Sequence, residues 1–154
     1  MDLTLPLDHA AIERILPHRY PFLLVDRVTE FEVDKRIVGI KNVSRNERYL
    51  SHAANGDPVL PPTILTEAVA QVGAILILAK PENRQRLPFF AGIKRVRFRH
   101  PVHPGDVLEV EANVVRIRSR MGVLKGVARV GGKVVFEGTM TFALGAPQPD
   151  GAIS

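Results

Sequence analysis

The sequence has no cysteine among its 154 residues. Disulfide bonds, metal sites built from thiolates and cysteine nucleophiles are therefore excluded. The first residues, Met1 to Thr4, lack the basic and apolar segments of a signal peptide. The longest apolar run, Ile64–Ala79, is shorter than a membrane span and contains Glu67. These absences predict a cytoplasmic protein with no membrane span.

The composition is that of a globular protein, with 45% hydrophobic and 24% charged residues. The length is typical of one domain. We expect this domain to cover residues 1–144, followed by a flexible C-terminal tail over residues 145–154. The net charge of +5 favours an acidic partner without identifying it.

The densest basic stretch is Lys94–His100, in which Arg95, Arg97 and Arg99 alternate with apolar residues. In a strand, this alternation places the three arginines on one face. No zinc-finger, helix-turn-helix or aromatic-rich motif accompanies them, so we expect no nucleic-acid partner. A solvated strand face is the alternative to a binding surface.

The predicted central helix, Ile64–Ala79, is apolar throughout except for Thr66, Glu67 and Gln71. A helix that is hydrophobic on all sides is buried on all sides. A buried carboxylate is costly unless it is paired, neutral or used in chemistry. Thr63, Glu67 and Gln71 recur every four residues and form one polar stripe. Glu67 is therefore a candidate functional group, and a core glutamate with a backbone or arginine partner is the alternative.

The rest of the pattern predicts a short helix after Asp8, a loop over Asn46–Pro61 and a series of strands. Gly131-Gly132 is a two-residue hairpin turn, and a change of apolar phase near Val114 predicts a bulge. The simplest packing wraps a curved antiparallel sheet around one long central helix, which is the α+β hot-dog fold. The predicted strands are Phe22–Phe31, Arg36–Val43, Phe89–Arg99, Asp106–Arg118, Met121–Val130 and Lys133–Leu144.

Several motifs resemble one known family in the right order along nearly the whole chain. Residues 16–28 read LPHRYPFLLVDRV, and later segments read FAGI (90–93), RFR (97–99), PV (101–102) and PGD (104–106). Together they resemble the bacterial 3-hydroxyacyl-[acyl-carrier-protein] dehydratases of fatty acid synthesis. The resemblance implies a homodimer, assembled further into a hexamer, that uses no metal and no dissociable cofactor. It also implies an acyl chain carried on phosphopantetheine, with basic surface docking the acyl carrier protein; we assign this docking to Arg95, Arg97 and Arg99.

The family uses a loop histidine of one subunit with a helix glutamate of the other, and the matching residues here are His52 and Glu67. Removing water from a 3-hydroxyacyl thioester takes a proton from C2 and delivers one to the leaving 3-hydroxyl. A neutral imidazole is the natural base near pH 7, and a carboxyl group in apolar surroundings can hold the second proton. The resemblance therefore assigns His52 as the base and Glu67 as the acid or water-positioning group. The remaining candidate substrate-binding residues are Pro62, Thr63, Gln71, Phe89 and Phe90. Gln71 can also orient Glu67. For the two phenylalanines, packing in the core is the alternative.

The loop departs from the family pattern. Ser51 replaces a glycine before His52, one additional residue precedes Pro58, and Pro62 replaces the glycine whose amide contacts the thioester oxygen. Proline has no N–H to donate, so either Thr63 supplies the next amide at the helix start or the oxyanion site is lost. Two other functions stay open: a hot-dog acyl thioesterase, and a catalytically impaired subunit that binds an acyl chain or a carrier protein.

The other histidines are given lesser roles. His18 belongs to the long first motif, where a structural use in the connection between helix and strand is expected. His100 and His103 flank Pro101 and are assigned to a turn or the surface. No metal-ligand spacing joins the histidines.

Overall fold

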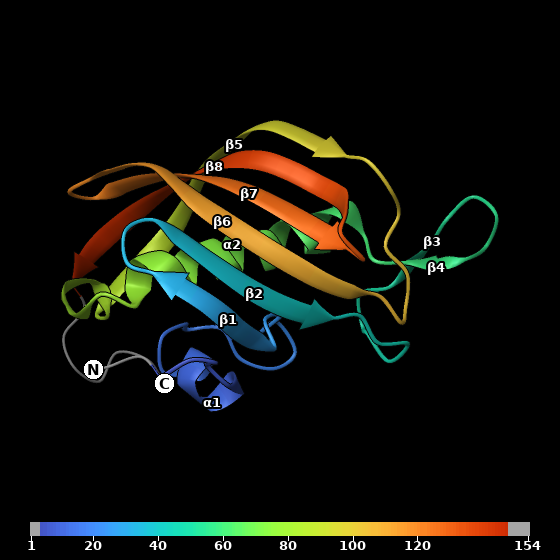
Figure 1. Cartoon of the computed structure of the whole chain (residues 1–154), viewed down its shortest axis with the longest axis horizontal. Helices are drawn as coiled ribbons and strands as arrows, with labels where there is room; N and C mark the ends of the chain where they lie inside the picture. The colour runs from blue at the N-terminus through green and yellow to red at the C-terminus, as the bar shows by residue number, and fades with distance from the viewer. Residues whose placement is uncertain (1–3, 148–154) are drawn as a thin grey trace.

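The computed structural model describes residues 4–147, in which six antiparallel strands form the main sheet. The strand order is β1-β2-β6-β7-β8-β5, and the long helix α2 (Pro62–Leu78) lies against one face (Figure 1). The predicted hot-dog arrangement of one helix and a curved sheet is confirmed. The strands are β1 (Arg27–Glu32), β2 (Arg36–Asn42), β5 (Arg86–Phe98), β6 (Val107–Arg118), β7 (Met121–Val130) and β8 (Lys133–Pro147).

Short elements complete the part of the chain that the structure describes. Helix α1 (His9–Glu13) is capped at its N-terminal end by Asp8, whose carboxylate accepts a hydrogen bond from the Ala11 amide at 2.8 Å. A 3₁₀ turn, η1 (Pro81–Asn83), follows α2. The strands β3 (Ser51–His52) and β4 (Pro58–Val59) form a separate hairpin, where a loop without strands was predicted.

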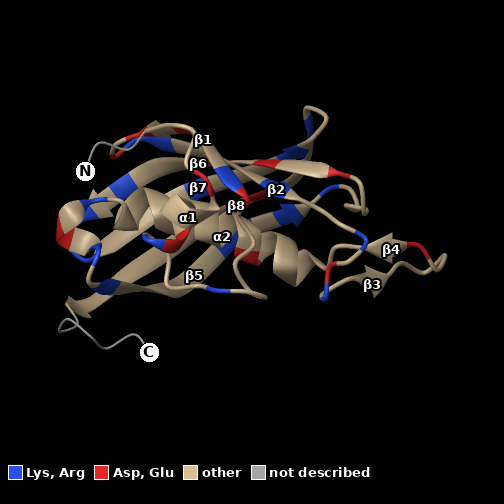
Figure 2. Ribbon diagram, turned by 90° about the horizontal axis from the view of Figure 1, so that it is seen from below, with Lys and Arg blue, Asp and Glu red and all other residues tan. Residues whose placement is uncertain are grey.

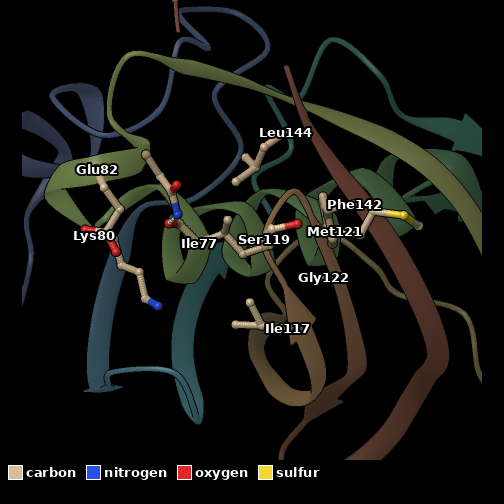
Figure 3. A pocket seen from close by; sticks show the side chains of 10 residues that line it. Ile77, Lys80, Glu82, Ile117, Ser119, Met121, Gly122, Phe142 and Leu144 are labelled. Atoms are coloured by element: carbon tan, nitrogen blue, oxygen red, sulfur yellow. Dashed lines mark hydrogen bonds between the residues drawn. The ribbon is translucent and has the colours of Figure 1, made fainter. Parts of the chain in front are cut away.

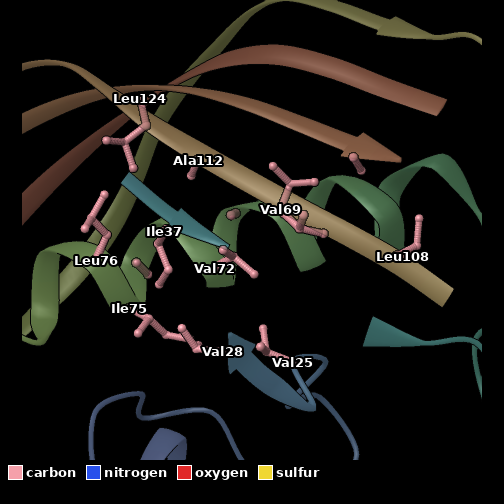
Figure 4. Close-up of a cluster of buried hydrophobic side chains, with 14 of the residues drawn as sticks. Val25, Val28, Ile37, Val69, Val72, Ile75, Leu76, Leu108, Ala112 and Leu124 are labelled. Carbon is pink, nitrogen blue, oxygen red and sulfur yellow. The ribbon is translucent and has the colours of Figure 1, made fainter. Parts of the chain in front are cut away.

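The core fills the space between α2 and the sheet. Val72 and Ile75 of α2 meet Val28 and Ile37 of the first two strands (Figure 4). The helix lies so close to β7 that a Cβ atom on Gly126 would be 2.4 Å from Val69 Cγ1. Deep burial of α2 is therefore a result of close contact with several strands.

The first turn of α2 differs from the rest of the helix. The helix begins two residues earlier than predicted, with Pro62 at its first position, where proline is tolerated. Pro62 and Thr63 are exposed and Glu67 is only partly buried, whereas residues 68–79 are buried. The expectation of burial on every side is therefore wrong for the N-terminal end, which opens toward solvent.

Several predicted strand features are confirmed and others are wrong. Gly131 and Gly132 adopt positive φ angles of 55° and 79° in the β7–β8 turn, and β6 has a bulge between Val114 and Arg116. The first strand begins at Arg27 and not at Phe22. The last strand continues to Pro147, so the part of the predicted tail over 145–147 is strand, and residues 148–154 lie outside the described residues.

Figure 2 shows lysine and arginine residues on most elements, with acidic residues among them. Among residues 4–147, Lys41 of β2 is a buried cation, and its Nζ lies 2.5 Å from Oε1 of the partly buried Glu47 in the following loop. No helix within residues 4–147 is long and apolar enough to cross a membrane.

Candidate active site

Glu67 is held by side chains that approach one of its two carboxylate oxygens. Gln71 Nε2 donates a hydrogen bond to Glu67 Oε1 at 2.9 Å, and His18 Nε2 lies 3.5 Å from the same oxygen. The other oxygen, Oε2, receives no hydrogen bond from the residues that the structure describes. The Glu67 side chain is 28% exposed, so it is only partly covered by the rest of the chain.

Gln71 fixes this arrangement because both polar atoms of its side-chain amide form hydrogen bonds within the protein. Its side chain is 1% exposed. Oε1 accepts a hydrogen bond from the Leu24 amide at 2.8 Å, and Nε2 donates to the Phe22 carbonyl at 2.7 Å as well as to Glu67. These bonds take backbone groups that a strand over residues 22–26 would use, which explains the late start of β1. Gln71 therefore orients Glu67 from inside the protein, and its amide is not free to bind substrate.

His18 lies beside Glu67. The sequence led us to expect a structural role for His18 and did not indicate that it is next to Glu67. Burial lowers the pKa of His18 and the Arg19 charge lowers it further, against the opposing effect of Glu67. Nδ1 is buried without a hydrogen-bond partner in the described part of the chain. A proton on Nδ1 would be an unsatisfied buried donor, so the neutral ring carries its proton on Nε2, toward Glu67.

The start of α2 presents one open backbone donor. Pro61 and Pro62 have no N–H. The amides of Ile64 and Leu65 both donate to the Pro61 carbonyl at 3.0 Å. Within residues 61–65, only the Thr63 amide is left for a ligand, at the positive end of the helix dipole. Thr63 is exposed, and Glu67 is one turn further along the same helix.

His52 lies on a projecting segment that we call the arm, residues 51–59, made of β3, β4 and their turn (Figure 1). Its side chain is exposed. No hydrogen bond or ion pair joins His52 to Glu67 of the same chain among the described residues. The structure therefore brings Glu67, Gln71 and His18 together in one chain and leaves His52 apart from them.

Phe89 and Phe90 lie on β5, which is an edge strand of the main sheet. They are 56% and 44% exposed, so their packing into the core, the alternative considered from the sequence, is wrong. Phe90 contacts Phe142 of β8 edge to face, with ring centroids 5.7 Å apart. Ile93 on the same strand is also exposed. The β5 edge is thus a row of exposed apolar side chains.

Two arginines of β5, and Arg99 directly after it, gather around Glu137 on β8. Arg99 Nε donates to Glu137 Oε2 at 2.7 Å, and Arg95 and Arg97 line a hollow of about 260 Å³ together with Glu137 and Lys125. The regular alternation expected for this strand is interrupted, because Arg95 has a φ angle of 54° in a bulge. The hollow nevertheless carries an excess of positive charge.

A second cavity, of about 250 Å³, lies beside the C-terminal end of α2, where Ile77 lines it (Figure 3). Ile77, Phe142 and Leu144 supply apolar lining, and Lys80 and Glu82 lie at its margin. Ile77 is ten residues beyond Glu67, which is about 15 Å along a helix. The sequence contained no signal for this cavity, because its lining comes from three separate stretches of the chain, residues 77–83, 117–122 and 142–144.

Comparison with known proteins defines the class. The FabA-like domain family matches residues 16–139, which is more than half of the chain. The chain belongs to this family. The 3-hydroxyacyl-[acyl-carrier-protein] dehydratase FabZ of Bacillus subtilis (strain 168) is 52% identical over 139 residues, covering 90% of this chain and 99% of the relative. The dehydratase of the same name from Bacillus velezensis has the same identity and coverage.

Solved structures agree with the fold. A chain of the dehydratase heterocomplex ApeI:P from Xenorhabdus doucetiae superposes with a TM-score of 0.74 and 22% identity, covering 98% of this chain and 95% of that chain. A hypothetical thioesterase from Streptococcus pneumoniae, solved with coenzyme A, gives a TM-score of 0.61 and 13% identity, covering 79% and 87%. At these identities the likeness concerns the fold alone.

Proposed function

We propose that the protein removes water from a 3R-hydroxyacyl thioester of acyl carrier protein and forms the trans-2-enoyl thioester. The observation that carries the proposal is the geometry at the start of α2. Glu67 is fixed through Oε1 and free at Oε2, one turn from the open amide of Thr63. The names of relatives that are 52% identical over 139 residues support the same reaction.

In this reaction the imidazole of His52 takes the proton from C2 of the substrate. The bond between C3 and the hydroxyl oxygen breaks, and the hydroxyl leaves as water with a proton from Glu67 Oε2. The Thr63 amide and the helix dipole stabilise negative charge on the thioester oxygen. The proton on His52 then passes to solvent, Glu67 regains one, and both groups return to their starting states.

The separation of His52 from Glu67 in one chain supports a site completed by a second copy. The edge of β1 is partly covered, because Leu7 and Val28 exchange two backbone hydrogen bonds. The β5 edge is 13 residues long and carries exposed Phe89, Phe90 and Ile93. Long apolar edges of this kind are covered by pairing in stable proteins. We infer that two β5 edges pair, so that Phe89 and Phe90 of each subunit border the acyl chain.

The acyl carrier protein is the acidic partner in this proposal, and the hollow that includes Arg95 and Arg97 supports docking. Arg99 is paired with Glu137 and contributes to this surface as part of that pair. Assembly of dimers into a hexamer follows from the family resemblance. A cytoplasmic location, which we expected from the sequence, completes the proposal. The mass of the native protein in solution tests the assembly.

The experiment is turnover of a 3R-hydroxyacyl-acyl carrier protein by the purified protein, with water loss and thioester cleavage measured separately. We expect an enoyl product that is lost in His52→Ala and in Glu67→Gln. A free acid as the main product would instead identify a thioesterase. Carrier-protein binding with no turnover of either kind would identify a subunit that binds without catalysis and would contradict the proposal.

A further inference from the structure

The arm that carries His52 makes few contacts with the rest of the protein. Its own hydrogen bonds are local: the Ala53 amide donates to the Asp57 carbonyl and the Gly56 amide to the Ala53 carbonyl, both at 2.8 Å. Most of its residues are exposed, and Gly56 at the tip has a φ angle of 87°. The direction of the arm therefore depends on how its base is attached.

Two hydrogen bonds attach the base of the arm to the connection between β5 and β6. The Leu60 amide donates to the Val102 carbonyl at 2.8 Å. His103 Nδ1 lies 3.0 Å from the carbonyl oxygen of Pro58. Pro58 is the residue that pairs with His52 across the hairpin. The His103 ring thus holds the residue directly opposite the proposed base.

The connection that carries His103 is itself well fixed. The His103 amide donates to Asp106 Oδ2 at 2.8 Å, and the Asp106 amide donates back to the His103 carbonyl at 3.1 Å. The Gly105 amide donates to the Val43 carbonyl next to β2 at 2.8 Å. Because a carbonyl can only accept, the bond to Pro58 requires the His103 proton on Nδ1. The side chain is therefore a directed donor on a rigid support.

We propose that His103 is a positioning residue, whose Nδ1–H holds the arm in the direction that His52 needs for proton abstraction. The inference rests on the proposed function, since it gives His52 the role of base. From the sequence we expected His103 only in a turn or on the surface, without a role in the reaction. The inference gives it one. An error of about 1 Å in the placement of a reacting group can cost on the order of 100-fold in rate, so the loss of one such anchor is measurable.

The test compares His103→Leu, which has no donor, with His103→Asn, whose amide can occupy the place of Nδ1–H. We expect His103→Leu to lower kcat about tenfold or more with little change in KM, and His103→Asn to retain most of the parent kcat. Hydrogen exchange gives a readout that is independent of activity. The Leu60 amide, adjacent to the anchor, exchanges about tenfold faster in His103→Leu and keeps the parent rate in His103→Asn. The Gly105 amide serves as the internal control and is unchanged in both.

Two results would overturn the inference. One is a His103→Leu variant with the parent kcat and the parent Leu60 exchange rate. The other is an equal loss in both variants while Gly105 stays protected, because the ring volume and not the donor would then matter. A parent protein with no dehydration at all would refute the proposed function instead, and the exchange rates would still decide whether His103 anchors the arm.

Discussion

Gln71 Nε2 donates a hydrogen bond to Glu67 Oε1, one helical turn earlier, over 2.9 Å. The same nitrogen donates to the Phe22 carbonyl, and Gln71 Oε1 accepts from the Leu24 amide. One buried amide thus fixes the carboxylate that the proposed reaction uses and the backbone segment before β1. Activity and stability are coupled at this residue.

Replacing Gln71 with leucine should therefore affect both properties. The buried Leu24 amide and the part-buried Phe22 carbonyl would lose their partners, which costs about 2–4 kcal/mol in the free energy of unfolding. Urea unfolding followed by circular dichroism measures this loss. Thr66→Ala is the matched control on the same helix, because it removes an exposed bond to the Pro62 carbonyl and should cost less than about 1 kcal/mol. A Gln71→Leu protein as stable as the parent would show that these bonds are not needed.

The Thr63 amide gives the next prediction. Thr63→Pro removes the one open N–H of the first turn. The first turn of a helix tolerates proline, so the helix itself should still form. We expect kcat to fall on the order of 10²–10³-fold, the typical effect of losing one oxyanion donor. Thr63→Ala keeps the amide and should retain most of the activity. Steady-state kinetics of the two variants separates the backbone donor from the side chain, and equal activity of both would exclude the Thr63 amide from the site.

His18 predicts a dependence of stability on pH. Burial holds the pKa of His18 below its ordinary value of 6.5, so the unfolded chain binds a proton there more readily than the folded chain. The contribution of neutral His18 to stability is therefore complete above that value and is lost as the pH falls below it. We expect the free energy of unfolding to decrease between about pH 7.5 and pH 5.5 more steeply in the parent than in His18→Gln.

The matched control for this measurement is His9→Gln, which removes an exposed histidine. It should keep the parent slope. Denaturant titrations at several pH values and one protein concentration give the slopes directly. A His18→Gln protein with the same slope as the parent would mean that His18 is protonated as easily in the folded chain as in the unfolded one.

The β5 edge predicts the oligomeric state. Lysines at Phe89 and Ile93 together would place two charges on the proposed contact, and like charges facing each other across paired edges disfavour association. We expect the Phe89→Lys/Ile93→Lys protein to be monomeric by sedimentation at concentrations where the parent is dimeric or larger, and to lose turnover. Val33→Lys changes an apolar side chain that is 60% exposed in the β1–β2 turn and is the control. A double variant that sediments like the parent would exclude this edge from the interface.

Much of the fold could be predicted from the sequence because its signals are local. The glycine pair at 131–132, the bulge near Val114 and the apolar run of α2 each depend on adjacent residues. The strand predicted from Phe22 could not be corrected in this way. Its first residues have their backbone groups bound by Gln71, which lies 47 residues beyond Leu24 in the chain.

The residues of the candidate site likewise fall into two groups, those that the sequence indicated and those that it could not. Glu67 could be singled out because a carboxylate is unusual in an apolar helix, and Gln71 because it follows at helical spacing. His18 could not be connected with Glu67, because the strands β1 to β4 and the loops between them separate the two residues in sequence. The anchoring of Pro58 by His103 was equally hidden, since a histidine directly before Pro104 and Gly105 has the sequence pattern of a turn or surface position.

The central claim is that His52 of one subunit and Glu67 of another complete a dehydratase site, and mixing inactive variants tests it most directly. His52→Ala and Glu67→Gln are unfolded and refolded together in equal amounts, and enoyl product from a 3R-hydroxyacyl-acyl carrier protein is measured. Half of the random dimers would be mixed and would contain one intact site, so the account predicts about a quarter of the parent activity. Each variant refolded alone should stay inactive. A mixture as inactive as its components, in which mixed dimers are demonstrated by mass spectrometry, would contradict a site shared between subunits.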